Sequence, residues 1–175
     1  MITNGLIVVK KTSEHYCGVE RDVWPLQYEN DNSHELLCED EPNVGLLDRM
    51  TDNLSFAQRY LSETLNHGIE GEILYCEFVD NDYVMFSDKL EEVKHRCIYL
   101  GWDYSWSDGD FYSCVYNDFH NELLADIKCK LNEYGLFQTS DDLDEFIYRR
   151  NALFCSCPQG IFEIGPFFKV KVFKL

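Results

Sequence analysis

The sequence predicts an α+β fold: a single domain over residues 1–175, with a mostly antiparallel sheet packed against two or three helices. The first observation is a series of short apolar runs that end at turn residues, a pattern typical of strands. The second is a set of longer segments in which apolar residues recur every three or four positions, a pattern typical of helices. Third, strands and helices neither alternate regularly nor divide into separate halves. Together these observations favour the α+β class.

The composition is strongly acidic. The chain has 32 Asp and Glu against 15 Lys and Arg, which gives a net charge of −17, and 45% of its residues are hydrophobic. That apolar fraction is enough for a packed core. The negative field repels nucleic acid and anionic lipid and attracts basic surfaces, so we expect no direct nucleic-acid binding. No apolar run of about 18 residues occurs, so we expect no transmembrane helix and no membrane partner.

The start of the chain and the cysteines predict a cytoplasmic protein. Lys10 and Lys11 follow a very short apolar run, the reverse of the order in a secretory signal. The eight cysteines are spaced irregularly and contain no C-x-x-C pair, so we interpret them as reduced thiols.

The first half of the chain combines predicted strands with an irregular acidic segment. That segment, at about 13–51, contains ten carboxylates and two arginines, with one short strand expected near Val23. A helix is expected at 55–66, with Asp52 or Asn53 as its cap and Gly68 after its end. The strands expected before residue 101 are 6–10, 72–79, 83–86 (after a turn at 80–82) and 97–100, and a short helix is expected within 87–95.

The organising stretch runs from Cys97 to Phe137. A strand at 97–100 stops at Gly101, and an aromatic and acidic loop follows at 102–110. A second strand, or an ordered entry to a helix, is expected at 111–116. From Asp118 the apolar positions form one stripe along a helix that we expect to continue to Tyr134, with Gly135 in the left-handed conformation at its end.

The last third predicts one helix and two strands. Thr139 and Asp142 form a capping box at the start of a helix with Leu143, Phe146 and Ile147 facing inward. The carboxylates of its first turns have a sufficient explanation in the helix dipole, so we do not assign a metal site there. Strands are expected at 161–164 and 167–173, and the alternating lysines of the second suggest an edge strand.

The motifs of known catalytic and cofactor sites are missing from the sequence. Cys155-Ser156-Cys157 supplies two soft ligands where structural zinc needs four. The spacing around Asp108-Gly109-Asp110 does not fit an EF-hand loop, and there is no G-x-S-x-G, Walker or dinucleotide-binding motif. We therefore expect no enzyme activity, no metal and no cofactor.

Two acidic and aromatic clusters are the candidate surfaces for binding a partner. Rings anchor protein interfaces, and carboxylates pair with arginine and lysine on the partner. The candidate residues are Glu39, Asp40 and Glu41 in the acidic segment and Trp102, Asp103, Tyr104, Trp106, Asp108 and Asp110 in the aromatic loop.

The last third resembles a family of small bacterial proteins, many of them immunity or toxin-neighbourhood proteins. The shared features are Gly101-Trp102-Asp103, the helix end Leu131–Phe137, the capped acidic helix from Asp141 to Phe146, and the final strand from Pro166 to Leu175. They span about 75 residues, within residues 97–175, and transfer no catalytic residue.

This resemblance implies a non-enzymatic immunity protein that binds and neutralises a cognate bacterial toxin, such as a basic nuclease, through its acidic surface. Two alternatives stay open: a small cysteine/histidine hydrolase-like enzyme and a general adaptor protein. The sequence does not set the oligomeric state.

Overall fold

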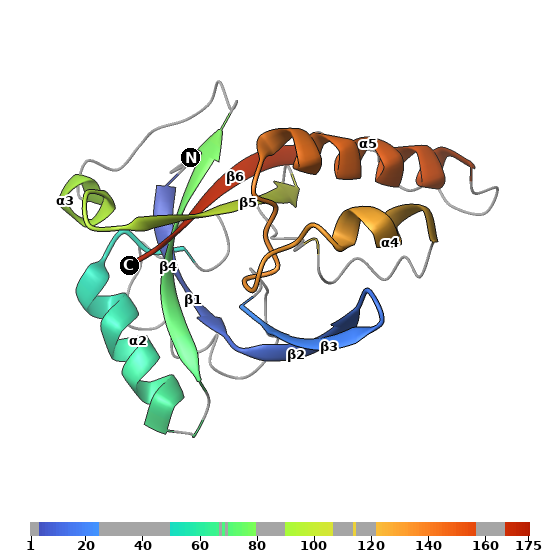
Figure 1. Cartoon of the computed structure of the whole chain (residues 1–175). Helices are drawn as coiled ribbons and strands as arrows, with labels where there is room; N and C mark the ends of the chain where they lie inside the picture. Colours follow the sequence, from blue (N-terminus) through green and yellow to red (C-terminus); the bar gives the residue numbers. More distant parts are fainter. Residues whose placement is uncertain are drawn as a thin grey trace.

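The computed structural model describes residues 4–24, 50–66, 68, 70–79, 90–106, 114, 122–156 and 167–175. Its centre is an antiparallel sheet of four strands in the order β1–β4–β6–β5 (Figure 1). These strands are β1 (Asn4–Lys10), β4 (Gly71–Val79), β5 (Ile98–Trp106) and β6 (Phe167–Lys174). The helices are α2 (Leu54–Asn66), α3 (Glu91–Lys94), α4 (Glu122–Lys128) and α5 (Ser140–Ser156). The arrangement confirms the predicted α+β class.

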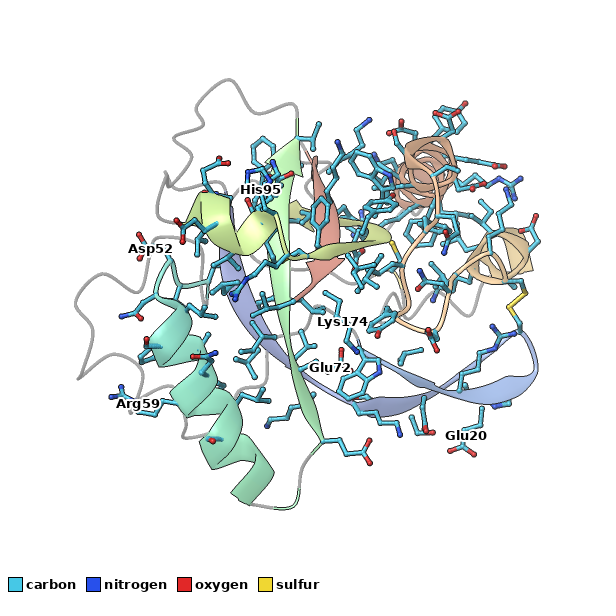
Figure 2. All side chains as sticks on the ribbon, turned by 60° about the vertical axis from the view of Figure 1, so that its left-hand side comes forward. Glu20, Asp52, Arg59, Glu72, His95 and Lys174 are labelled. Atoms are coloured by element: carbon cyan, nitrogen blue, oxygen red, sulfur yellow. A yellow bond between two sulfur atoms is a disulfide. The ribbon has the colours of Figure 1, made fainter. Side chains whose placement is uncertain are left out.

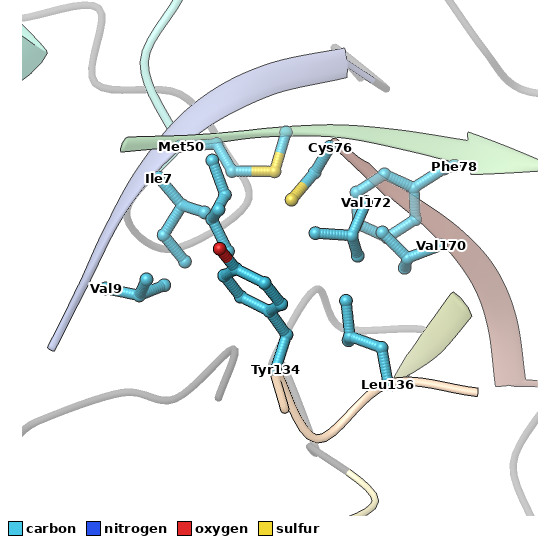
Figure 3. Packing of buried hydrophobic residues seen from close by; sticks show 10 residues of the cluster. Ile7, Val9, Met50, Cys76, Phe78, Tyr134, Leu136, Val170 and Val172 are labelled. Carbon is cyan, nitrogen blue, oxygen red and sulfur yellow. The ribbon is translucent and has the colours of Figure 1, made fainter. Parts of the chain in front are cut away.

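Successive residues of a strand point to opposite faces of the sheet. Each strand therefore has apolar side chains on both faces, and both faces are covered by other parts of the chain. On one face α2 and α3 pack against β1 and β4 through Leu6, Ala57, Ile73, Tyr75, Leu90 and Val93. On the other face the segment around Tyr134 and Leu136 closes over the strands (Figure 3). The buried residues there are Ile7, Val9, Met50, Leu74, Cys76, Phe78, Tyr134, Leu136, Val170 and Val172.

A separate β-hairpin follows β1 and corrects the prediction of an irregular segment from residue 13. Strands β2 (Thr12–Tyr16) and β3 (Val19–Val23) pair around a two-residue turn, Cys17-Gly18. The strands carry mostly polar residues, so no apolar run announced them, and the turn lacks the Asn-Gly pair that signals such hairpins. The rest of the acidic segment, 25–49, lies outside the described residues.

The last strand is central in the sheet, not at its edge as predicted. β6 pairs with β4 on one side and with β5 on the other. Its lysines are tolerated there because each meets a partner. Lys169 Nζ lies 3.1 Å from Asp144 Oδ2, Lys174 Nζ lies 2.7 Å from Glu72 Oε1, and Lys171 Nζ lies 5.1 Å from the ring centroid of Trp102.

Helix α4 ends earlier than the apolar stripe predicted. It stops at Lys128, although Leu131 and Tyr134 of the stripe are buried as expected and Gly135 has the expected left-handed φ of 70°. The cause is Asn132, whose Oδ1 accepts hydrogen bonds from the N–H groups of Tyr134 (2.9 Å) and Leu136 (3.1 Å). Such local bonds compete with the helix. Asn132 Nδ2 also donates to the carbonyl oxygen of Leu100 on β5 at 2.9 Å, so this turn is fastened to the sheet.

We expect Asn132→Ala to lower the free energy of unfolding by about 2 kcal/mol, because it removes three partly buried side-chain hydrogen bonds. Urea denaturation measures the change. Asn132→Asp keeps the acceptor and should lose about half as much. Equal losses in the two variants would show that the bond to Leu100 alone holds the turn.

Helix caps follow the sequence closely. Thr139 Oγ1 accepts the Asp142 N–H at 3.2 Å, which is the N-cap half of the predicted capping box, and its hydroxyl donates to Asp142 Oδ2 at 2.7 Å. The Asn53 side chain accepts the N–H of Phe56 at 3.1 Å at the start of α2, as predicted. Of the other expectations, the turn at 80–82 and the strands at 83–86 and 161–164 lie outside the described residues.

One disulfide corrects the expectation of eight reduced thiols. Cys17 in the hairpin turn is bonded to Cys129, directly after α4, across 112 residues of sequence. Cys76, Cys97 and Cys114 are free. The pairing depends on two segments that meet only in the folded chain, so the irregular spacing gave no sign of it.

Candidate protein-binding surface

Strand β5 includes Trp102–Trp106, the first part of the stretch predicted as an aromatic loop, and residues 107–110 lie outside the described residues. The strand continues past Gly101 because the β5–β6 register shifts between Tyr99 and Gly101. On the outer side of β5, the N–H of Trp102 donates to the carbonyl oxygen of Phe137 at 2.7 Å, and the N–H of Phe137 returns a bond of 3.0 Å. The edge of the sheet is therefore covered at this point by the segment that follows α4.

Asp103 was predicted to contact a partner, but its side chain is completely buried and is not available at the surface. Its Oδ1 accepts hydrogen bonds from the N–H of Tyr104 (3.0 Å), the N–H of Cys114 (3.1 Å) and the thiol of Cys114 (3.1 Å). A carboxylate that holds two backbone groups in the interior has a structural role.

Tyr104 is also fully buried and is likewise removed from the predicted interface. Its ring packs against Phe146 of α5 with centroids 6.1 Å apart, and the Arg150 guanidinium lies 5.9 Å from the ring centroid. Both sides of β5 are covered at this end, which is why alternation along the strand exposes neither Asp103 nor Tyr104.

Trp102 is the one predicted ring whose side chain stays partly exposed among the described residues. It packs beside the α4–α5 core, and Lys171 covers part of its face. Trp106 pairs with Phe167 in the sheet register, and its side chain is not described. The remaining predicted site residues, Glu39, Asp40, Glu41, Asp108 and Asp110, lie outside the described residues.

Several of the described cations pair with the chain's own carboxylates. Six of them form ion pairs: Lys11 with Asp22 and Glu70, Lys94 with Glu77, Lys130 with Asp142 and Glu145, Arg149 with Asp126 and Glu145, Lys169 with Asp144, and Lys174 with Glu72. These six cations are therefore already engaged by carboxylates of the same chain. Figure 2 labels Lys174 and Glu72, which lie next to each other beside β4.

Other carboxylates face solvent with no ion pair to a described residue. They are Glu91 and Glu92 on α3, Glu133 in the turn after α4, and Asp141 on α5. In addition, residues 25–49 contribute seven carboxylates and one arginine to the sequence. Among the described residues, the uncompensated charge is therefore carried by exposed positions.

Helix α5 presents an exposed face that the sequence analysis did not single out. Asp141, Asp144, Tyr148 and Ala152 point outward, and we call them the α5 outer face. Tyr148 is 75% exposed, more than any other exposed large hydrophobic residue of the described chain. The inward positions Leu143 and Phe146 had been identified correctly, so the same periodicity predicts this face as their complement.

The free thiols of Cys76, Cys97 and Cys114 all have raised pKa values. Burial raises the pKa of Cys76 and Cys114, and the charge of Asp103 raises both further. Burial also raises the pKa of Cys97, whose Sγ lies 3.2 Å from the carbonyl oxygen of Val93. Because the thiolate is the attacking species, these environments oppose catalysis by the described cysteines. The described residues also contain no group of three or more His, Cys, Asp or Glu side chains that could hold a metal ion.

The same thiols predict a loss of stability in alkali. Their folded-state pKa values lie above the ordinary value of 9.0, so the stability present below pH 9 is lost as pH rises and unfolded-state thiols ionise. The expected slope reaches about 1.4 kcal/mol per pH unit for each buried thiol. Urea denaturation at several pH values measures it. Cys114→Ala should make the slope shallower, and an unchanged slope would contradict this assignment.

Two further findings bear on this chain. No helix in the described part combines the length and apolar character needed to cross a bilayer. No model of a known family, no curated protein and no solved structure matches the chain.

Proposed function

We propose that this chain is a non-enzymatic immunity protein, which binds a cognate bacterial toxin with a basic surface, such as a basic nuclease, and neutralises it in the cytoplasm. The observation that carries the proposal is the use of charge. Six described cations are held in ion pairs within the chain, while the net charge is −17 and carboxylates remain exposed. A surface of this kind attracts a cationic partner and repels nucleic acid.

The α5 outer face is the contact surface that we assign to this partner. Tyr148 offers a large ring with a polar tip, the type of residue that anchors interfaces. Asp141 lies two turns before it on the same helix face and would meet arginine or lysine beside that anchor; Asp144, one turn before it, is paired with Lys169. Binding here would occlude the toxin's cationic active-site face without any chemical step.

The first test is co-expression with the product of the adjacent reading frame. We expect that product to be toxic alone and harmless when this chain is present, with a complex that forms at low salt. Raising the salt concentration should slow association, because steering contributes about tenfold to a thousandfold to the rate and is screened by ions. A harmless neighbour, or no complex at low salt, would refute the proposal.

The second test places the interface with matched variants. Asp141→Lys and Glu92→Lys make the same charge change at exposed first-turn positions of two different helices. We expect the first to slow association on the order of tenfold and the second to have a much smaller effect.

Tyr148→Ala should weaken binding about 30-fold, as for an interface hot spot. Ile98→Ala, at a residue 69% exposed on β5, should leave binding unchanged. Equal effects of the two members of either pair would move the interface away from α5.

A further inference from the structure

The Cys17–Cys129 disulfide joins the tip of the β2–β3 hairpin to the end of α4. The two Cα atoms lie 5.6 Å apart, a normal span for this bond. In Figure 2 the yellow bond lies between the hairpin turn and the helix, away from the sheet. It therefore links two peripheral elements.

The hairpin turn is built around a residue that turn chemistry does not favour. Cys17 and Gly18 have φ angles of 57° and 71°, the combination of a two-residue hairpin turn with both central residues left-handed. Asn, Asp and Gly adopt this conformation readily, and cysteine does not. Cys17 is the one non-glycine residue with positive φ in the described chain. We infer that its sulfur, and not its backbone preference, accounts for its presence.

The hairpin is held at two places. At its base Val23 is buried in the core, and Lys11 bridges Asp22 and Glu70 with distances of 3.0 Å to each. At its tip the disulfide makes the covalent attachment to Cys129. A two-stranded ribbon with polar faces is only marginally stable by itself, so the tip attachment decides how firmly the hairpin stays in place.

The disulfide is also accessible to solvent. Cys129 is exposed and Cys17 is partly exposed; of the free thiols, Cys76 and Cys114 are buried and Cys97 is partly exposed. Exchange with an external thiol requires access to the disulfide sulfur. A reductant can therefore reach this pair while the buried thiols of Cys76 and Cys114 stay protected.

We propose that Cys17 and Cys129 form a reversible redox clamp, which a dithiol reductant opens to release the hairpin tip from α4. One thiolate of the reductant attacks a disulfide sulfur, breaks the S–S bond and forms a mixed disulfide. Its second thiolate then displaces that cysteine. The products are two protein thiols and the oxidised reductant, so two electrons and two protons pass to the protein. The sheet and its core keep their structure, because no part of them depends on this bond.

The test is hydrogen exchange of the backbone amides, measured by mass spectrometry with and without millimolar dithiothreitol. In the oxidised protein the linked Cys17–Cys129 peptide should be present. Reduction should speed exchange at residues 12–23 about tenfold or more and leave β4 and β6 unchanged. It should also lower the melting temperature by roughly 10 °C, because a link across a long loop is lost. Oxidised glutathione should restore the disulfide and the slower exchange of the oxidised protein.

Matched variants separate the bond from the turn. Cys17→Asn suits the left-handed turn but cannot form the bond, and Cys129→Ser removes the bond with the turn unchanged. Both should exchange like the reduced protein, whereas Cys97→Ser should exchange like the oxidised one. Free thiols at both positions in the protein as purified would overturn the proposal, as would a bond that resists reduction until the protein unfolds. Unchanged hairpin protection in both variants would also overturn it. None of these outcomes depends on the toxin partner.

Discussion

Replacing Gly101 by alanine is expected to lower the free energy of unfolding by about 3 kcal/mol. A Cβ atom at this position would lie 2.5 Å from the carbonyl oxygen of Phe137 and 3.0 Å from the Cβ of Leu136. That carbonyl cannot simply turn away, because it accepts the N–H of Trp102 at 2.7 Å. The new methyl group must therefore separate the chain at Phe137 from β5 and break the hydrogen bonds between them.

Urea denaturation of Gly101→Ala measures this loss, and Gly68→Ala is the control. Gly68 has a φ of 77° and nothing within 4 Å of an added Cβ, so alanine there adds backbone strain without a clash. Its expected cost is about 1 kcal/mol. If the two variants lose the same stability, the close approach of Phe137 to β5 is wrong.

This junction also shows what the sequence could not predict. Gly101 resembled the end of a strand because glycine commonly interrupts one. In the structure it marks the shift in register where the chain around Phe137 approaches closely, and that chain comes 36 residues later. No local pattern reports which distant segment will need the space of a missing side chain. The loop predicted at 102–110 was therefore wrong for Trp102–Trp106, which belong to β5.

Local signals were predicted well, because their causes are local. The N-caps by Thr139 and Asn53 need only neighbouring residues, and both form as expected. The left-handed Gly135 follows from local preference too. Residues 12–23 show the limit. A polar hairpin held by Val23 at its base and by a disulfide to Cys129 is stabilised by distant contacts, so propensity alone does not indicate it.

The candidate interface was predictable only in its charge. Composition gave the excess of carboxylates, but which of them remain uncompensated depends on long-range ion pairs. Lys174 and Glu72 are 102 residues apart in the sequence, and Lys169 and Asp144 are 25 apart. The position of Tyr148 on the α5 outer face, in contrast, follows from helical periodicity once Phe146 is placed inside.

Asp103→Ala is the second substitution for which we expect a large effect, a loss of about 3 kcal/mol. The carboxylate is fully buried and accepts the N–H groups of Tyr104 and Cys114 together with the Cys114 thiol. Alanine removes the acceptor and leaves the N–H groups of Tyr104 and Cys114 buried without a hydrogen bond to this side chain. The free-energy cost of burying unbonded N–H groups is larger than the net contribution of the hydrogen bonds to stability. Thermal and urea denaturation measure the change.

Asp103→Asn separates the charge of this carboxylate from its hydrogen bonds. The amide oxygen can still accept the two N–H groups, so the variant should lose about 1 kcal/mol. Because the charge of Asp103 and its bond to the thiol both raise the pKa of Cys114, that pKa should fall in Asp103→Asn. The alkaline loss of stability should then become shallower than in the parent protein. A surface carboxylate that binds a partner would behave differently: neither variant would change stability, and both would weaken the complex. An Asp103→Ala protein with unchanged stability would therefore contradict the structural role of Asp103 and favour its role in binding a partner.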